Sequence, residues 1–377
     1  MLRPSKTPRN MHVTSLAARF AAAAVIFTGL AQAQDYGTAD LPADLAAVGT
    51  KILGVMNKTP NASRNLGYSE GPVGDVDGNL YFTEDNSGLG NIWKVSPTGQ
   101  ASNFYNGPGM PNGLEFGTDG KMNSAEKGGI ATYDVKVGGS SRAMIKTSGY
   151  LLDAGFRIND LTIASNGGMF FTNHGQGNQF FYRDPAGAVT AYGKDLANIG
   201  MGEPNGPEYI EERKMLLVNS SAENKVYRFD VSVDGKVSNR SVFTSIPVPD
   251  GLTVDEKGNI YIASYGNGSI YVFGPDGAAS VDKALGSIKV GTGAAGNASN
   301  CAFGGIDGKT LFITGNGGAY KVQMKVKGRT RPGSTSLQRA LLLRPAAAPS
   351  AREGFALDGR KIAARLPAAL LLVSRPR

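Results

Sequence analysis

The repeating unit of this 377-residue chain is clearest in Pro249-Asp-Gly-Leu-Thr-Val-Asp-Glu-Lys-Gly-Asn-Ile-Tyr-Ile-Ala263. Gly251 to Asp255 alternates apolar and polar residues, Glu256 to Asn259 reads as a turn, and Ile260 to Ala263 is a second apolar run. A third apolar run, Ser269 to Phe273, follows shortly afterwards. Gly-Asn between two apolar runs is typical of a hairpin, because tight hairpin turns need a positive φ. The stretch therefore predicts a small antiparallel sheet.

The same pattern recurs along most of the chain, and a short polar signature precedes each copy. The signatures lie 42 to 50 residues apart, at Glu70-Gly71, Asn112-Gly113, Asn159-Asp160, Asn205-Gly206, Asp250-Gly251 and Asn300-Cys301. Six similar units with three to four strands each predict an all-β fold, a six-bladed β-propeller. A β-sandwich would not show six similar units, and a β-helix needs far shorter repeats.

In a propeller the innermost strand of each blade lines the central channel, so residues at one offset before these strands point towards the axis together. Taken singly, each signature residue is an ordinary turn residue. As a set they offer two carboxylates and four amides, which predicts a metal site in the central channel. Oxygen ligands suit Ca²⁺ best, accept Mg²⁺ or Mn²⁺, and suit Zn²⁺ less naturally. His174 is the only histidine after residue 33 and Cys301 is the only cysteine, which excludes a zinc site of nitrogen and sulfur ligands.

The N-terminal segment has the features of an export signal. Arg19 is followed by an apolar stretch from Phe20 to Phe27 and then by Ala31-Gln32-Ala33, which predicts a signal peptide over residues 1–33 with cleavage after Ala33. Met11 offers a second start codon. The apolar stretch is too short to span a membrane. We therefore expect the mature protein to be periplasmic or secreted.

Charge is unevenly distributed between the two ends and the middle. Residues 1–33 carry four basic residues and no acidic ones, and residues 328–377 carry ten basic and two acidic ones. This leaves 25 basic and 29 acidic residues for 34–327, so nucleic acid is not an expected partner. The tail from residue 328 is interpreted as disordered or non-native sequence rather than as an arm that binds nucleic acid or anionic membrane.

The propeller is predicted over residues 67–327, preceded by an N-terminal segment at 34–66. Within that segment, Leu41 to Val55 is a helix candidate, and the part leading to Tyr68 is a candidate for a strand that closes the ring with the last blade. Cys301 falls on a predicted inner strand. A lone cysteine there is interpreted as buried packing rather than as a nucleophile.

As an ordered set, five motifs resemble the gluconolactonase family, which includes the senescence marker protein, also called regucalcin. They are Ser69-Glu-Gly-Pro72, Arg157-Ile-Asn-Asp160, Pro204-Asn-Gly206, Pro249-Asp-Gly-Leu252 and Asn300-Cys-Ala-Phe-Gly-Gly305. The resemblance implies a six-bladed propeller with a metal in its channel and the hydrolysis of sugar lactones. It implies that Glu70, Asn205 and Asp250 bind the metal, that Asn159 binds metal or substrate, that Arg157 holds the substrate, and that Asp250 is also the general acid/base.

These roles agree with the chemistry of lactone opening. A divalent cation polarises the carbonyl and lowers the pKa of a bound water, while Asn112 and Asn300 are candidates to donate hydrogen bonds to the oxyanion or to sugar hydroxyls. His174 stands where many relatives have an Asp-Pro-rich loop, and it is a candidate substrate contact. We therefore expect an exported, metal-dependent lactonase acting on a small-molecule lactone. Two alternatives stay open: an organophosphate hydrolase on the same scaffold, and a non-catalytic calcium-binding propeller.

Overall fold

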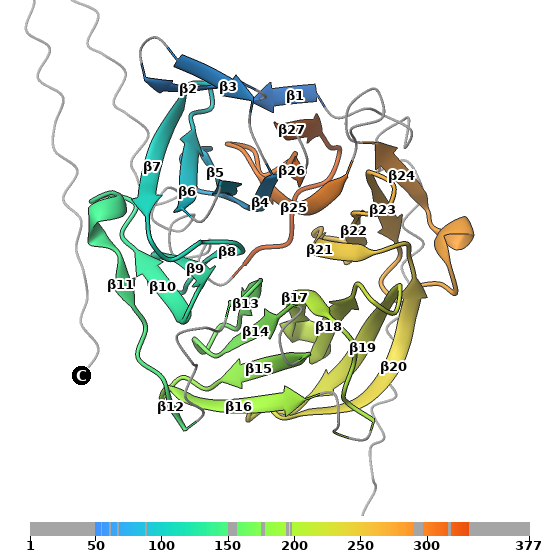
Figure 1. The fold of residues 1–377 in the computed structure, drawn as a ribbon. Coiled ribbons are helices and arrows are strands. Elements are labelled where there is room, and N and C mark those ends of the chain that lie inside the picture. The colour runs from blue at the N-terminus through green and yellow to red at the C-terminus, as the bar shows by residue number, and fades with distance from the viewer. Residues whose placement is uncertain are drawn as a thin grey trace, which may run out of the picture. The chain divides into compact units, whose positions relative to one another are not determined.

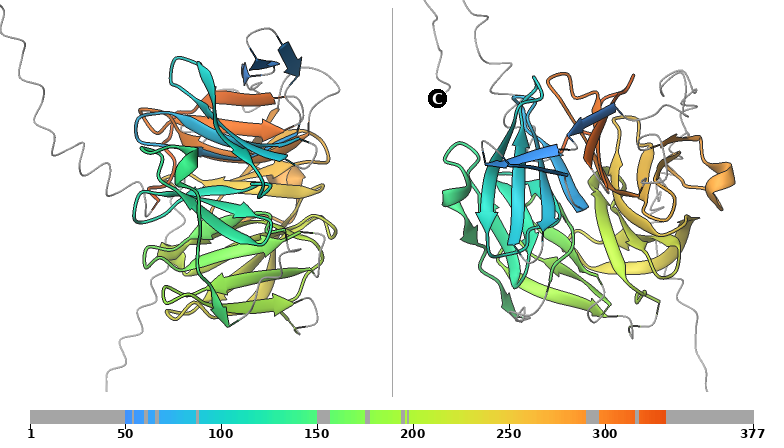
Figure 2. Two further views of the ribbon diagram at one scale, coloured as in Figure 1. Left: turned by 60° about the vertical axis from the view of Figure 1, so that its left-hand side comes forward. Right: turned by 45° about the horizontal axis from the view of Figure 1, so that its top comes forward.

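The computed structural model describes residues 50–331, except for short gaps at 54, 60–61, 66–67, 87–88, 150–156, 175–177, 194–195, 197, 290–296 and 316–317. The predicted signal peptide and most of the predicted tail therefore lie outside the described residues. Six sheets, antiparallel except for one parallel pair of strands, are arranged around a common centre, each with one strand facing that centre (Figures 1 and 2). This confirms the prediction of an all-β, six-bladed β-propeller.

The blades follow one another along the chain, and the consecutive strands of each blade run from the inner strand outwards, apart from β12 in blade 3 and β1 in blade 6. Blade 1 contains β4 (Tyr68–Gly74), β5 (Leu80–Asn86), β6 (Leu89–Val95) and β7 (Ala101–Gly107), and blade 2 contains β8 (Leu114–Phe116), β9 (Met122–Glu126), β10 (Gly129–Tyr133) and β11 (Ala143–Met144). Blade 3 contains β13 (Leu161–Ile163), β14 (Met169–Asn173), β15 (Gln179–Arg183) and β16 (Ala188–Gly193), with β12 (Ser148–Gly149) parallel to β16. Blade 4 contains β17 (Pro204–Ile210), β18 (Met215–Ser220), β19 (Lys225–Val231) and β20 (Val237–Ser245). Blade 5 contains β21 (Pro249–Val254), β22 (Ile260–Ser264), β23 (Ser269–Phe273) and β24 (Gly286–Lys289).

Blade 6 closes the ring with a strand from the other end of the chain. It consists of β25 (Ala298–Gly304), β26 (Thr310–Gly315), β27 (Gly318–Gln323) and β1 (Thr50–Leu53), which pairs antiparallel with β27. The segment before Tyr68 thus supplies the closing strand, as predicted. The helix prediction for Leu41 to Val55 is wrong where the structure describes that segment, because β1 and the first residue of β2 (Val55–Thr59) are extended; β2 forms a hairpin with β3 (Ala62–Asn65).

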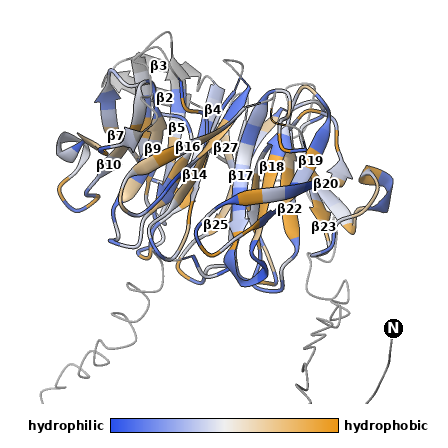
Figure 3. Cartoon of the chain, turned by 90° about the horizontal axis from the view of Figure 1, so that it is seen from below, coloured by the Kyte–Doolittle hydropathy of each residue, from blue (hydrophilic) through white to orange (hydrophobic). Residues whose placement is uncertain are grey.

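The hydrophobic core of the described residues is divided among the blade junctions. Six clusters of buried side chains lie there, one between each pair of neighbouring blades; for example, Leu80 and Phe82 of blade 1 pack with Phe312 of blade 6. Apolar residues are accordingly concentrated on strands such as β18 and β22, whereas β7 and β20 carry many polar residues (Figure 3). Cys301 is 2% exposed in the cluster between blades 5 and 6, which confirms its interpretation as packing. Among the described residues no helix is long and apolar enough to cross a membrane.

The polar signatures lie within or just before the inner strands, and in four blades they coincide with a β-bulge. The strand register shifts between Glu70 and Val73, with equivalent shifts in β17, β21 and β25. A bulge adds one residue to a strand and re-aims its side chains. The glycines of the signatures are needed because the blades nearly touch here: a Cβ on Gly251 would lie 2.0 Å from Cγ of Asn300, and one on Gly113 would lie 1.9 Å from Oδ1 of Asp160.

After β27 the chain crosses to the end of the channel opposite the signatures. The amide nitrogen of Gly328 donates to the carbonyl of Gly308 at 3.0 Å, and that of Arg329 donates to the carbonyl of Val254 at 2.9 Å. Residues 328–331, which composition alone assigned to the tail, are thus held against blades 5 and 6. The remainder of the predicted tail lies outside the described residues.

Candidate functional site

Two buried carboxylates, Glu70 on β4 and Asp250 on β21, share one hydroxyl group. The hydroxyl of Tyr68 donates to Oε1 of Glu70 and lies 3.4 Å from Oδ2 of Asp250. Both carboxylate residues are only 5% exposed. Blades 1 and 5, which are not neighbours in the ring, therefore meet at the axis through these side chains.

Asn205 joins this pair from blade 4. Its side-chain nitrogen donates to Oγ of Ser221 at 3.1 Å, and its amide also hydrogen-bonds Asp250. Ser221 in turn donates to the carbonyl of Pro249 at 2.8 Å, which ties β17 to the start of β21. The side-chain nitrogen of Asn205 is thus directed to Ser221, and its side-chain carbonyl oxygen is the kind of group that a hard cation binds.

A third carboxylate lies one step further along the channel. The side-chain nitrogen of Asn300 donates to Oδ2 of Asp160 at 3.0 Å and the same amide hydrogen-bonds Glu70, so Asn300 bridges the two carboxylates. Its oxygen accepts the amide hydrogen of Cys301 at 2.8 Å. In this structure the amide of Asn300 is directed towards Asp160 and Glu70, and its role as a donor to the oxyanion or to sugar hydroxyls stays a prediction.

The carboxylates of Glu70, Asp160 and Asp250 lie close together, and the positive charges around them do not balance their negative charge. Burial raises the pKa of Glu70 to about 7 and that of Asp160 to about 7. Burial, followed by the charges of Glu70 and Asp160, raises the pKa of Asp250 well above its usual value. The charge of Arg157 opposes the shift at Glu70. A divalent cation at this point would relieve the excess charge, since an opposite charge nearby favours the ionised carboxylate.

The donor set fits an oxygen-liganded cation. Among the described residues no three His, Cys, Asp or Glu side chains form a metal-binding group by themselves. A set made of Glu70, Asp250 and the carbonyl oxygen of Asn205 mixes carboxylates with an amide, as calcium sites commonly do. The structure brings these three predicted ligands together; for the fourth, Asn159, it shows a half-buried residue whose backbone joins blades 2 and 3.

The other predicted site residues, Arg157, His174 and Asn112, differ in how far they are buried. Arg157 is half-buried, and its charge lowers the pKa of both Glu70 and His174, so it lies near both. Nε2 of His174 is 3.8 Å from a carboxylate oxygen of Glu203, with the two side chains 37% and 44% exposed. Burial lowers the pKa of His174, and the charge of Glu203 opposes this. Asn112 is 7% exposed, and its carbonyl accepts a hydrogen bond from Thr83.

The comparison with protein families decides the assignment. The model of the SMP-30/Gluconolactonase/LRE-like region matches residues 68–316, which is more than half of the chain and covers all six inner strands. This chain belongs to the SMP-30/gluconolactonase family. The resemblance inferred from the motifs is thereby confirmed.

Proteins named as lactonases are recognisably similar in sequence to this chain. Pentonolactonase XacC of Haloferax volcanii is 29% identical over 181 residues, which are 46% of this chain and 58% of that protein. Lactonase drp35 of Staphylococcus haemolyticus is 26% identical over 227 residues, which are 55% of this chain and 66% of that protein. The chain thus spans less than two thirds of the length of these relatives.

Solved structures of the family share the fold. The gluconolactonase of Xanthomonas campestris has a TM-score of 0.56 at 22% identity, covering 68% of this chain and 86% of that chain. The calcium-binding regucalcin of Agrobacterium tumefaciens has a TM-score of 0.60 at 19% identity, covering 76% and 99%.

The structure adds site residues that the sequence did not reveal. Tyr68 precedes Glu70 by two positions, so the period of two along a strand places both side chains on one face, and this signal was available. Asp160 stands in its signature where four others have glycine, which also marks it. Arg331, described below, carried no such signal because it lies in a segment of tail-like composition.

Proposed function

We propose that this chain is a metal-dependent hydrolase that opens a sugar lactone or a related small lactone. The observation that carries the proposal is the buried group of Glu70, Asp250 and Asn205, which meets at the axis under the hydroxyl of Tyr68. Membership of the SMP-30/gluconolactonase family and relatives named as lactonases support it.

Glu70, Asn205 and Asp250 would hold the cation, with Asn159 as a further oxygen ligand or a substrate contact. Ca²⁺ fits the oxygen donors best, and Mg²⁺, Mn²⁺ and Zn²⁺ are alternatives. When bound, such a cation polarises the lactone carbonyl and lowers the pKa of coordinated water. Asn300 and Tyr68 orient Glu70 from two sides, which limits the positions that its carboxylate adopts.

Asp250 is the residue placed to move protons. Its carboxylate accepts the proton of the attacking water and returns it to the ring oxygen that leaves as an alkoxide. General acid/base catalysis of this kind contributes ~10²–10⁴-fold in rate.

Arg157, Asn159, Asn112 and His174 would bind the substrate around this centre. The guanidinium of Arg157 is planar and offers two directed donors, which suits a polyol or a carboxylate. Its charge lowers the pKa of both Glu70 and His174, so it lies within reach of both the carboxylates and the histidine. A sugar lactone held there would direct its carbonyl towards the buried group and its hydroxyls towards solvent.

The test is to incubate the purified full chain with glucono-1,5-lactone and with a panel of γ- and δ-lactones. Hydrolysis is measured as the release of acid. A phosphotriester and a fluorophosphate are assayed beside them. Lactone turnover supports the proposal. Turnover of the phosphorus esters alone would replace it with the organophosphate hydrolase, and Ca²⁺ binding without any turnover would replace it with a non-catalytic calcium-binding propeller.

We further infer that the protein is exported to the periplasm or secreted, on the basis of Arg19, the apolar stretch and Ala31-Gln32-Ala33. Mass spectrometry of the mature protein from a bacterial expression host should find an N-terminus at Gln34. A mature chain that retains residues 11–33 would contradict this inference.

A further inference from the structure

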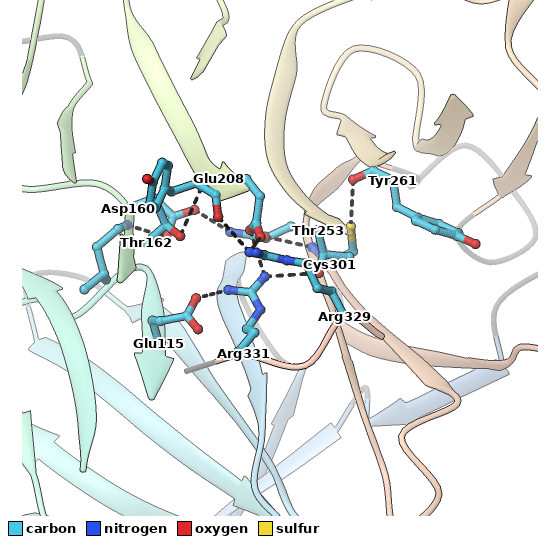
Figure 4. Close-up of polar contacts among 12 residues, drawn as sticks. Glu115, Asp160, Thr162, Glu208, Thr253, Tyr261, Cys301, Arg329 and Arg331 are labelled. Atoms are coloured by element: carbon cyan, nitrogen blue, oxygen red, sulfur yellow. Dashed lines mark hydrogen bonds and ion pairs between the residues drawn. The ribbon is translucent and has the colours of Figure 1, made fainter. Parts of the chain in front are cut away.

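Arg331 enters the channel from the end opposite the carboxylate group and contacts three blades at once. Its guanidinium forms an ion pair with Oε2 of Glu115 in blade 2, donates to Oε2 of Glu208 in blade 4 at 2.8 Å, and donates to Oγ1 of Thr253 in blade 5 at 3.1 Å (Figure 4). Glu208 is 1% exposed and Glu115 is 4% exposed.

Each of these three partners lies three residues after a predicted site residue. Glu115 follows Asn112, Glu208 follows Asn205, and Thr253 follows Asp250. Side chains alternate along a strand, and the bulges of β17 and β21 each add one residue. Positions three apart therefore point to the same side of these strands. Arg331 thus contacts β17 and β21, the strands that carry Asn205 and Asp250, at the end of the channel opposite those two residues.

The neighbouring Arg329 makes a different set of contacts. It pairs with Glu208 at 2.8 Å and Glu212 at 3.2 Å, and it donates to the carbonyl of Tyr209 at 2.7 Å, all in blade 4. The side chain of Arg329 therefore contacts one blade, while that of Arg331 connects three. The two arginines lie two residues apart, so Arg329 is a matched control.

Removing the guanidinium of Arg331 would leave Glu115 and Glu208 buried in one channel with fewer positive charges. Breaking a buried ion pair by removing one partner is strongly destabilising, because the remaining charge stays buried without a compensating charge. The strain falls on β8, β17 and β21, and the last two of these strands carry predicted metal ligands. A cavity of about 610 Å³ lies beside Arg331 and extends to Asp160 and Asn300, so the strands have space into which to shift.

We propose that Arg331 is a positioning residue of the metal centre: by joining Glu115, Glu208 and Thr253 it fixes the spacing of the strands that carry Asn205 and Asp250. The role rests on the proposed function, because it concerns the cation and the reaction assigned to those ligands. It makes residues 328–331 a part of the functional domain.

The experiment compares the wild-type full chain with Arg331→Ala, Arg331→Lys and Arg329→Ala. Three quantities are measured: Ca²⁺ affinity by calorimetry, Tm, and the kcat and KM of lactone hydrolysis. Removing a residue that orients metal ligands typically weakens affinity by about 10–100-fold, which is the loss expected for Arg331→Ala. Arg331→Lys should recover part of it, and ethylguanidinium added to Arg331→Ala should restore affinity and kcat.

Arg329→Ala should lower Tm while changing Ca²⁺ affinity by less than about threefold, because it ties only blade 4. Two results would overturn the inference about Arg331 but not the proposed function. One is an unchanged Ca²⁺ affinity in Arg331→Ala, and the other is an equal loss of affinity in Arg331→Ala and Arg329→Ala without rescue by ethylguanidinium. A wild-type chain that binds no divalent cation would overturn the proposed function and this inference with it.

Discussion

The hydroxyl of Tyr68 lies 3.4 Å from Oδ2 of Asp250, although the two residues are 182 positions apart in the chain. The same hydroxyl donates to Glu70, so a single phenol connects both predicted carboxylate ligands. Its hydrogen bonds favour the ionised forms and lower the pKa of Glu70 and of Asp250, against the larger effect of burial.

Tyr68→Phe removes this hydroxyl while keeping the ring that packs edge-on against Tyr265. The pKa of Asp250 should rise, because the charged form loses a donor. If Asp250 must be ionised to accept a proton, the acidic limb of the kcat/KM profile moves to higher pH. The measurement is a pH–rate profile of both proteins, and a profile that moves to lower pH would contradict the assignment.

Asp250→Asn preserves the shape of the side chain and removes its charge. Turnover of lactones should fall by at least about 10²-fold, because the general base is lost. Ser221→Ala is a useful comparison, since it removes a group that orients Asn205 and Pro249 without touching the proton path. Turnover by Asp250→Asn within about tenfold of wild type would show that another group moves the proton.

The stability of the metal-free chain should depend on pH in a direction set by Glu70 and Asp160. Burial raises the pKa of both to about 7, from ordinary values of 4.5 and 3.8. A carboxyl group whose pKa is raised by folding stabilises the protein at low pH, and this contribution is lost as the pH rises through about 4 to 7. Added Ca²⁺ should reverse the trend, because it binds the ionised carboxylates.

Thermal melts of the EDTA-treated chain at about pH 5 and about pH 8, with and without excess Ca²⁺, test this linkage. The Tm without metal should be lower at the higher pH, and Ca²⁺ should raise Tm most at that pH. A chelated chain that becomes more stable on going from the lower to the higher pH would contradict the charge balance described for the site.

Gly251→Ala tests the close approach of blades 5 and 6 at the axis. The new Cβ would lie 2.0 Å from Cγ of Asn300, which bridges Glu70 and Asp160. Overpacking of this kind costs roughly 1–3 kcal/mol or more, and Ca²⁺ affinity should fall with it. Gly274→Ala is the control, since a Cβ there meets nothing within 4 Å. Equal effects of the two substitutions on Tm would contradict the packing argument.

Cys301→Ala should leave lactone turnover unchanged and lower Tm slightly. The thiol is buried, lies 3.6 Å from the carbonyl of Tyr261, and has its pKa raised by burial. A thiol reagent should therefore label Cys301 only after unfolding. Rapid labelling of the folded chain, or loss of turnover in Cys301→Ala, would contradict its role as packing.

The blades could be predicted from the sequence because their signals are local. Alternating apolar runs and Gly-containing turns fall within about 40–50 residues, and their repetition fixes the number of units. The signature positions followed from the same register, and the structure brings Glu70, Asn205 and Asp250 together. The bulges were not predicted, since Asn-Gly and Asp-Gly read equally well as turns.

The other end of the channel escaped prediction because its contacts are long-range. Arg331 reaches residues 78 to 216 positions away, and its basic neighbours gave that segment the composition of a tail. The sequence also does not show that the amide of Asn300 contacts Asp160 and Glu70, so only a role towards the substrate was considered for it. In both cases the partners of a polar side chain had to be seen before its role could be assigned.

The most direct test of a metal-dependent lactonase is metal add-back to the chelated full chain. Acid release from glucono-1,5-lactone is followed after EDTA treatment, and then during titration with Ca²⁺, Mn²⁺, Mg²⁺ or Zn²⁺ while bound metal is counted. We predict that turnover disappears on chelation and returns in proportion to the occupancy of one cation per chain, with Asp250→Asn inactive throughout. Full turnover by a chain shown to be free of metal would contradict it.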